Sequence, residues 1–208
     1  MDRHQVFATN IFVQDDFLFE ETVLQMKNYI QKLWQEKQLL QLHHKAADFN
    51  WQTESNLHTK DEFKIFADMV LDTSKEILET LDYAVEDIAI TDMWGNVLRK
   101  GEVHPPHTHS NNFLSGVYYL YSDKAAGIQF FDPRPSSDVM VPKKTNKTHN
   151  NSNLLSFASK TNRAVFFPSW LQHWVPQNIS EKNRISIAWN VQLKGEVGEH
   201  NEYQSATF

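Results

Sequence analysis

The residues GEVHPPHTH (101–109), followed by the strand-like run LSGVYYL (114–120), constrain the fold more than any other part of the sequence. His107 and His109 are two positions apart, and side chains two positions apart on an extended chain project from the same face. Two imidazoles about 6.6 Å apart along a strand can converge on one metal ion through bonds of about 2.0–2.2 Å. The pair predicts a metal site, and the alternative for an isolated pair is a histidine-rich turn.

A third histidine strengthens the prediction of a metal site. His173 ends the segment FFPSWLQH (166–173), in which an apolar strand-like run is followed by a turn. Taken alone, His173 is better explained as a half-buried turn residue that packs on Trp170 or Trp174. Together, the three histidines His107, His109 and His173 are the candidate metal ligands.

The segment RISIAWNV (184–191) alternates strictly between two kinds of residue. Apolar side chains at every second position predict a strand with one face packed on an apolar layer such as helices. Arg184 and Ser186 then point to the opposite face, towards the interior of a barrel. A buried arginine needs an anionic partner, and its planar fork suits a carboxylate, to which Ser186 adds a donor. A salt bridge to a protein acid is the alternative.

The remaining pattern predicts an α+β fold that is mainly β, with helices first and strands later. We expect a strand over 6–13 and helices over about 20–36 and 60–83, the second with capping-box spacing between Thr59 and Glu62. After Tyr83 the strand-like runs are 88–97, 114–121, 128–131, 154–157, 164–167 and 184–192. Several short strands favour a sandwich or barrel. Residues 133–153 are polar, which indicates a solvated loop or a lid over a site.

Composition places broad limits on function. The 208 residues suit a single domain, which we predict to comprise a helical buttress over about 15–85 and a β core over about 86–195. The absence of cysteine excludes a disulfide scaffold, a thiolate site and a cysteine nucleophile. The net charge of −6 argues against sequence-independent nucleic-acid binding. No apolar run approaches a membrane span of about 18 residues, and the N-terminus has no apolar signal core, so we expect a cytoplasmic protein.

These motifs together resemble the 2-oxoglutarate/Fe(II)-dependent oxygenases, and more narrowly a family of oxygenases common in phages and marine bacteria. The matching segments are WGNV (94–97), the histidine pair with its strand (107–120), GIQFFDPR (127–134), FPSWLQH (167–173) and RISIAWN (184–190). The resemblance implies a double-stranded β-helix, or jelly roll, with iron at its open end and helices that buttress the core.

Carried over to this sequence, the resemblance makes His107 and His173 iron ligands and puts His109 where the superfamily usually has a carboxylate. An imidazole there raises the net charge of the site by one unit relative to the usual facial triad. Zinc becomes a candidate beside iron, because three histidines and a water form a known zinc arrangement. Asp132 is a candidate for supplying the missing carboxylate, although Asp-Pro-Arg is also typical of a turn.

For the cosubstrate, the resemblance implies that Arg184 and Ser186 bind the distal carboxylate of 2-oxoglutarate. Tyr119 occupies a strand position whose hydroxyl often assists there. Asn96 and Trp94 lie on the preceding strand, on one face, and are expected to line the cosubstrate or substrate pocket.

The implied activity is oxygenation, with hydroxylation of an unidentified substrate and oxidative decarboxylation of 2-oxoglutarate to succinate and CO2. The substrate is expected to be a small molecule or a protein side chain. Two alternatives remain: a cupin-type dioxygenase or isomerase that needs no 2-oxoglutarate, and a metal-stabilised module that binds without chemistry. His104 is expected to point away from His107, and the other histidines are expected at the surface, namely His4, His43, His44, His58, His149 and His200.

Overall fold

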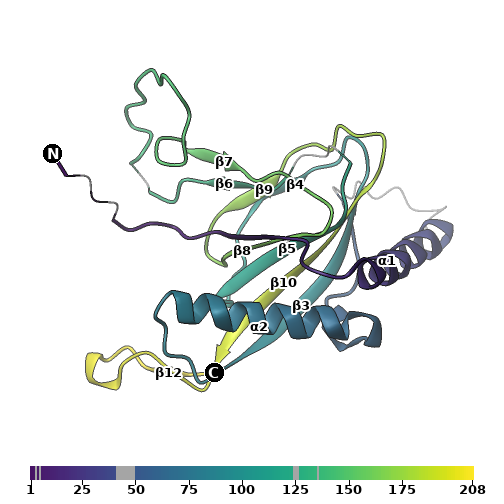
Figure 1. The fold of residues 1–208 in the computed structure, drawn as a ribbon, viewed down its shortest axis with the longest axis horizontal. Helices are drawn as coiled ribbons and strands as arrows, with labels where there is room; N and C mark the ends of the chain where they lie inside the picture. Colours follow the sequence, from purple (N-terminus) through teal and green to yellow (C-terminus); the bar gives the residue numbers. More distant parts are fainter. Residues whose placement is uncertain (3, 5, 41–49, 124–126, 135) are drawn as a thin grey trace.

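Two antiparallel sheets dominate the computed structural model, which describes all residues except 3, 5, 41–49, 124–126 and 135 (Figure 1). The larger sheet has the order β1-β8-β5-β10-β3-β2, with β1 Phe12–Asp15, β2 Trp51–Gln52, β3 Asp87–Leu98, β5 Leu114–Tyr121, β8 Arg163–Pro168 and β10 Arg184–Lys194. The smaller sheet has the order β4-β9-β6-β7, with β4 His104–His107, β6 Gln129–Phe131, β7 Leu154–Ser156 and β9 His173–Val175. The predicted class, a mainly β jelly roll with helices on one side, is confirmed.

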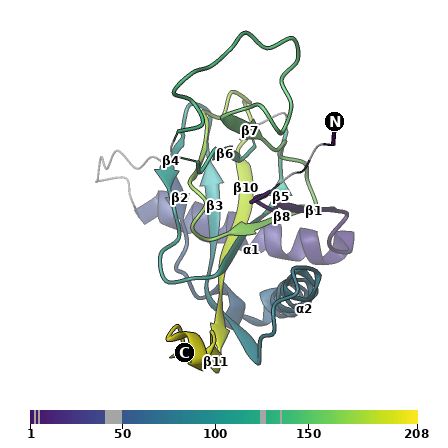
Figure 2. The same ribbon diagram turned by 90° about the vertical axis from the view of Figure 1, so that its left-hand side faces the viewer.

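Two helices cover one face of the larger sheet (Figures 1 and 2). They are α1 (Glu20–Leu40) and α2 (Lys64–Thr80), and short 3₁₀ turns occupy Leu57–Thr59, Asp61–Phe63 and His200–Glu202. A small hairpin of β11 (Glu196–Val197) and β12 (Ala206–Thr207) follows β10. Among the described residues, no helix is long and apolar enough to cross a membrane.

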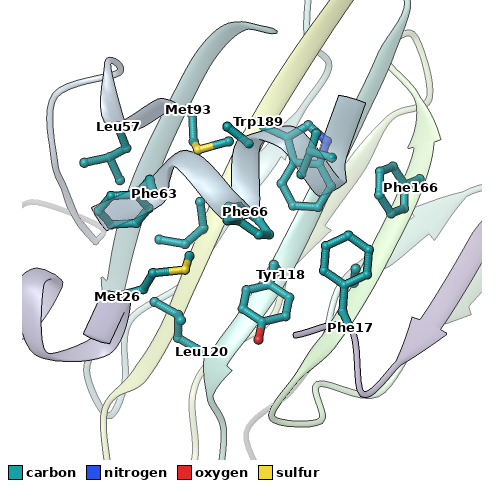
Figure 3. Close-up of a cluster of buried hydrophobic side chains, with 14 of the residues drawn as sticks. Phe17, Met26, Leu57, Phe63, Phe66, Met93, Tyr118, Leu120, Phe166 and Trp189 are labelled. Carbon is teal, nitrogen blue, oxygen red and sulfur yellow. The ribbon is translucent and has the colours of Figure 1, made fainter. Parts of the chain in front are cut away.

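Strand β10 separates two apolar clusters, as its alternating sequence predicts. Ile187 and Trp189 are fully buried against the helices, and the Trp189 ring lies 5.5 Å from the ring of Phe66 on α2 (Figure 3). Position 116 on β5 must be glycine, because a Cβ there would overlap the Trp189 indole. The opposite face of β10 points to the interior between the two sheets. A second apolar cluster fills that interior and consists of Tyr119, Ile128, Phe130, Val165, Phe167 and Leu171.

The helices and long strands lie close to their predicted positions, and the short elements differ. The first strand begins at Phe12, not at residue 6, and Phe7 adopts a left-handed backbone with φ of 57°. The capping box does not form, because the Thr59 hydroxyl donates to the carbonyl of Asn56 and α2 begins only at Lys64. The described residues of 133–153 form no helix or strand and are mostly exposed, and they extend beyond the smaller sheet (Figure 2).

Candidate metal centre

The three predicted ligand histidines come together between β4 and β9. His107 ends β4 and pairs in register with His173, the first residue of β9, while His109 follows two residues after β4. One ring nitrogen from each histidine lies within 4.8 Å of the others. Among the described residues, this is the one group of three or more potential ligand side chains close enough to hold a metal ion.

Backbone carbonyls orient two of these rings. The Nδ1 atom of His107 lies 2.8 Å from the carbonyl of Pro105, and the Nδ1 atom of His173 lies 2.9 Å from the carbonyl of Leu171. A carbonyl only accepts, so each Nδ1 carries the proton and each Nε2 presents a lone pair. The Nε2 atoms of His109 and His173 are 3.3 Å apart. Two nitrogens bound at right angles to one ion at about 2.1 Å would be separated by about 3.0 Å, so the donor set fits a metal.

Burial keeps the three imidazoles neutral at physiological pH. It lowers the pKa of His109 to about 4 and that of His173 to about 3, and in both cases the neighbouring His107 lowers the value further. Burial also lowers the pKa of His107. Because metal ligation requires neutral imidazole, the site can bind a cation at neutral pH without first losing protons.

The same pKa values predict that the metal-free protein loses stability as the pH falls from 7.5 to 5. The unfolded chain takes up protons near pH 6.5, whereas the folded chain resists protonation of His109 and His173 until pH 3 to 4. In that window the unfolded state binds more protons, so the free energy of unfolding falls with pH, by about 2 kcal/mol at pH 5 for each such histidine.

Urea unfolding in the presence of a chelator at pH 7.5, 6 and 5 measures this effect. The salt-bridged carboxyls of Asp15 and Asp132, whose pKa values are lowered to about 2 by Arg163 and Arg134, change protonation only at lower pH. An unfolding free energy that stays constant between pH 7.5 and 5 would contradict the neutral burial of the histidines.

Asp132 does not supply a carboxylate to the cluster, so that suggestion from the sequence is wrong. Its two carboxylate oxygens accept hydrogen bonds of 2.9 and 2.6 Å from the guanidinium of Arg134. The turn interpretation of Asp-Pro-Arg explains this, because the backbone N–H of Arg134 also donates to Asp132. The ligand group is therefore all-histidine.

Arg184 lies in the interior, as the alternation of β10 predicts. It is 4% exposed, pairs with Leu98 of β3, and its guanidinium carbon lies 5.7 Å from the centre of the Tyr119 ring. Burial lowers its pKa, whereas the Tyr119 side chain acts in the opposite direction. The buried guanidinium is thus a positive group at the inner end of the jelly roll.

Asn96, Ser186 and Tyr119 form one row across β3, β10 and β5, since Ser186 pairs with both of the others. All three are buried. The Tyr119 oxygen accepts a hydrogen bond from the N–H of Ile128 at 3.2 Å, which leaves its own proton to be donated. The Asn96 carbonyl oxygen accepts from the Gln52 and Asn50 amides at 3.0 and 3.4 Å, so its NH2 group is the part left to face a ligand. Beside Arg184, this row presents donors, which suits an anion.

His104 belongs to the same region, contrary to the prediction from strand alternation. Its ring stacks on that of His107, with centres 4.4 Å apart and planes 18° apart. The reason is local: Pro105 and Pro106 lie between the two histidines, and the pairing of β4 with β9 shifts register there. The two prolines in His-Pro-Pro-His could have indicated this arrangement, because proline interrupts regular strand pairing and with it the alternation of side chains between the two faces.

Trp94 lies near the histidine cluster, whereas the described histidines outside this region are exposed or half-buried. Trp94 lies beside the centre, with its ring 5.7 Å from that of His109. The predicted surface histidines His4, His149 and His200 are exposed, His58 is half-buried, and His43 and His44 lie outside the described residues.

A cavity of about 530 Å³ lies next to this region but does not include the three histidines. The N-terminal segment and the end of β6 line it, and Phe130 and Leu171 form part of its wall. Phe130 also contacts the metal centre, with its ring 5.8 Å from that of His173. The cavity and the metal centre are thus neighbours that share a wall.

Comparisons with known proteins agree with this geometry. Residues 92–190 match the family described as "Putative 2OG-Fe(II) oxygenase", and no curated protein matches the sequence. A Pseudomonas putida prolyl-4-hydroxylase is 13% identical with a TM-score of 0.61, over 88% of this chain and 92% of that chain. HygX from Streptomyces hygroscopicus, solved with nickel and 2-oxoglutarate bound, is 10% identical with a TM-score of 0.61, over 96% and 91% of the two chains.

A third similar structure is SnoN, an alpha ketoglutarate-dependent epimerase from nogalamycin biosynthesis, at 10% identity and a TM-score of 0.61, over 88% of this chain and 78% of that one. At such identities these structures establish the shared fold, and the family match covers residues 92–190, just under half of the chain. The family match is the finding that favours the oxygenase interpretation over the cupin and non-catalytic alternatives. The segment that holds His107, His109, His173 and Arg184 is therefore similar in sequence to the 2OG-Fe(II) oxygenase family, and the chain shares the fold of the structures named above.

Proposed function

We propose that this protein hydroxylates a small molecule or a protein side chain, with Fe(II) held by His107, His109 and His173 and 2-oxoglutarate held by Arg184, Ser186, Tyr119 and Asn96. The observation that carries the proposal is the combination of a metal-fitting histidine cluster with a buried arginine in one interior. The histidine cluster alone or the buried arginine alone has another explanation. A ligand that binds a metal at one end and carries a negative charge at the other accounts for both features together.

The chemistry of 2-oxoglutarate corresponds to these two halves. It has a keto acid at one end, which is a metal-binding group, and a second carboxylate at the other end. The guanidinium of Arg184 can donate two parallel hydrogen bonds to that distal carboxylate. Ser186 and Tyr119 add hydroxyl donors from the same row. When bound, iron would activate O2, the oxidant, which would take two electrons from 2-oxoglutarate, giving succinate and CO2, and two from the substrate C–H bond, giving the hydroxylated product.

The protein contributes position and exclusion of water. Phe130 and Phe167 line the interior beside His173, with ring centres 5.8 and 4.7 Å from its own. Apolar walls around a charged ligand strengthen its hydrogen bonds to Arg184 and keep bulk water away from the reacting atoms. We propose that Trp94, which is half-buried with its ring 5.7 Å from that of His109, lines the substrate pocket.

Hydroxylation is the outcome we propose among those that this fold supports. The similar structures include a prolyl-4-hydroxylase and an epimerase, so the jelly roll serves more than one reaction. Hydroxylation needs no residue beyond those that hold iron, cosubstrate and substrate, and for that reason it is the simplest reaction for this site.

Succinate formation tests the proposal without a known substrate. The protein, reconstituted with Fe(II), is incubated with 2-oxoglutarate and O2, and succinate and O2 uptake are followed. We expect slow succinate production that needs iron and is lost in Arg184→Met. Production at an undiminished rate in Arg184→Met, or none with the wild-type protein, would contradict the proposal.

A further inference from the structure

His104 contacts the metal centre and is connected through Asn50 to Asn96, a member of the donor row beside Arg184. Its ring stacks on that of His107 at one end of β4. At the other end, His104 pairs with Val175 of β9, and three residues later the side chain of Asn178 donates to the carbonyl of Leu98 at 2.9 Å. Leu98 is the partner of Arg184 in the larger sheet. The chain thus brings the His104 end of the β4–β9 pair against the Arg184 end of β10.

Hydrogen bonds to Asn50 determine which nitrogen of His104 carries its proton. The Asn50 amide NH2 lies 3.4 Å from the Asn96 carbonyl oxygen and 3.3 Å from Nδ1 of His104. An amide NH2 group only donates, so Nδ1 of His104 accepts and the proton of the neutral ring sits on Nε2. His104 therefore has the opposite tautomer to His107, whose Nδ1 carries the proton. His107 presents a lone pair to a metal, whereas His104 presents an N–H donor.

We infer that the Nε2–H of His104 donates a hydrogen bond to a carboxylate of the acidic cosubstrate, an inference that rests on the function proposed above. His104 adjoins the metal histidines through its ring contact with His107 and adjoins Asn96 through Asn50. The neighbouring polar groups from β3, β5 and β10 are donors as well. The charge of Arg184 acts on the His104 ring, which agrees with this placement. Because Nδ1 already accepts from Asn50, His104 is a donor and not an additional metal ligand.

His104→Phe and His104→Gln separate this role from a structural one. Phenylalanine retains a ring that can stack on His107 but has no donor, whereas glutamine restores an NH2 donor near the position of Nε2. A hydrogen bond to a charged group contributes enough that its loss weakens binding about 10- to 100-fold. We expect His104→Phe to weaken 2-oxoglutarate binding by that factor and His104→Gln to recover most of it.

The experiment uses the full chain loaded anaerobically with Fe(II), with 2-oxoglutarate as titrant and the visible charge-transfer band as the signal. Metal affinity is measured separately by Zn(II) competition with a chelator, and His200→Phe, at an exposed site, is the matched control. The inference holds if His104→Phe weakens 2-oxoglutarate binding while Zn(II) affinity changes less than about threefold. Unchanged 2-oxoglutarate affinity, or a parallel loss of zinc affinity that glutamine does not restore, would overturn it. Absence of 2-oxoglutarate binding by the wild-type protein would instead overturn the proposed function itself.

Discussion

Replacing Arg184 by methionine is expected to abolish 2-oxoglutarate binding while metal binding is retained. Arg184 is 4% exposed, and we propose that it meets the distal carboxylate in a site closed to solvent. Removing one partner of a buried charge pair typically costs 3–5 kcal/mol, which corresponds to a loss of affinity of roughly 150- to 5,000-fold. Methionine has a similar length and is apolar, so it fills the interior without leaving a cavity.

Arg184→Lys is the matched control for this result. Lysine keeps the charge and loses the planar fork, so we expect an intermediate affinity, because a single ammonium cannot form two parallel hydrogen bonds to a carboxylate. Isothermal titration of 2-oxoglutarate into the Zn(II)-loaded variants measures the series. If Arg184→Met binds 2-oxoglutarate as well as the wild-type protein does, the assignment of this residue is wrong.

Substitutions of His109 are expected to have the second largest effect, and they act on the metal. His109→Ala removes one of three ligand nitrogens and should weaken Fe(II) and Zn(II) binding by about 100-fold or more, since even residues that only orient ligands contribute about 10- to 100-fold. His109→Asp should keep or improve Fe(II) binding, because it restores the facial triad of two histidines and one carboxylate.

Chelator competition with both metals measures the series, and His149→Ala, at an exposed histidine outside the ligand group, is the control. We expect His109→Ala to bind Fe(II) more weakly than the wild-type protein, and His109→Asp to bind it as tightly or more tightly. Equal affinities in the wild-type protein, His109→Ala and His109→Asp would show that His109 is not a ligand and that the cluster is a packing arrangement.

Long alternating segments of the sequence predicted their structure well because one physical requirement dominates them. In RISIAWNV (184–191), every second side chain must be buried against the helices, so the register and the position of Arg184 both follow. The same holds for β5, where the predicted strand 114–121 matches the observed bounds. The three histidines were identified because His107 and His109 have the spacing of two ligands on one face of an extended chain, and His173 follows a second strand-like run.

Short elements were not predictable, because long-range contacts determine them. Strands β4 and β9 have only four and three residues, and β4 contains two prolines that remove backbone donors. Their pairing depends on the rest of the jelly roll, and the stacking of His104 on His107 depends on that pairing. The Asn50 and Gln52 amides reach Asn96 through the two-residue strand β2, which no periodicity indicates.

The most direct test is an anaerobic titration of metal-free protein with Fe(II) and then with 2-oxoglutarate, followed by visible absorption. A weak charge-transfer band that needs both components and is absent in Arg184→Met is the predicted result, because it requires one ligand to span the histidine cluster and the buried arginine. Iron binding with no band on addition of 2-oxoglutarate would contradict the account and favour a cupin-like metal site.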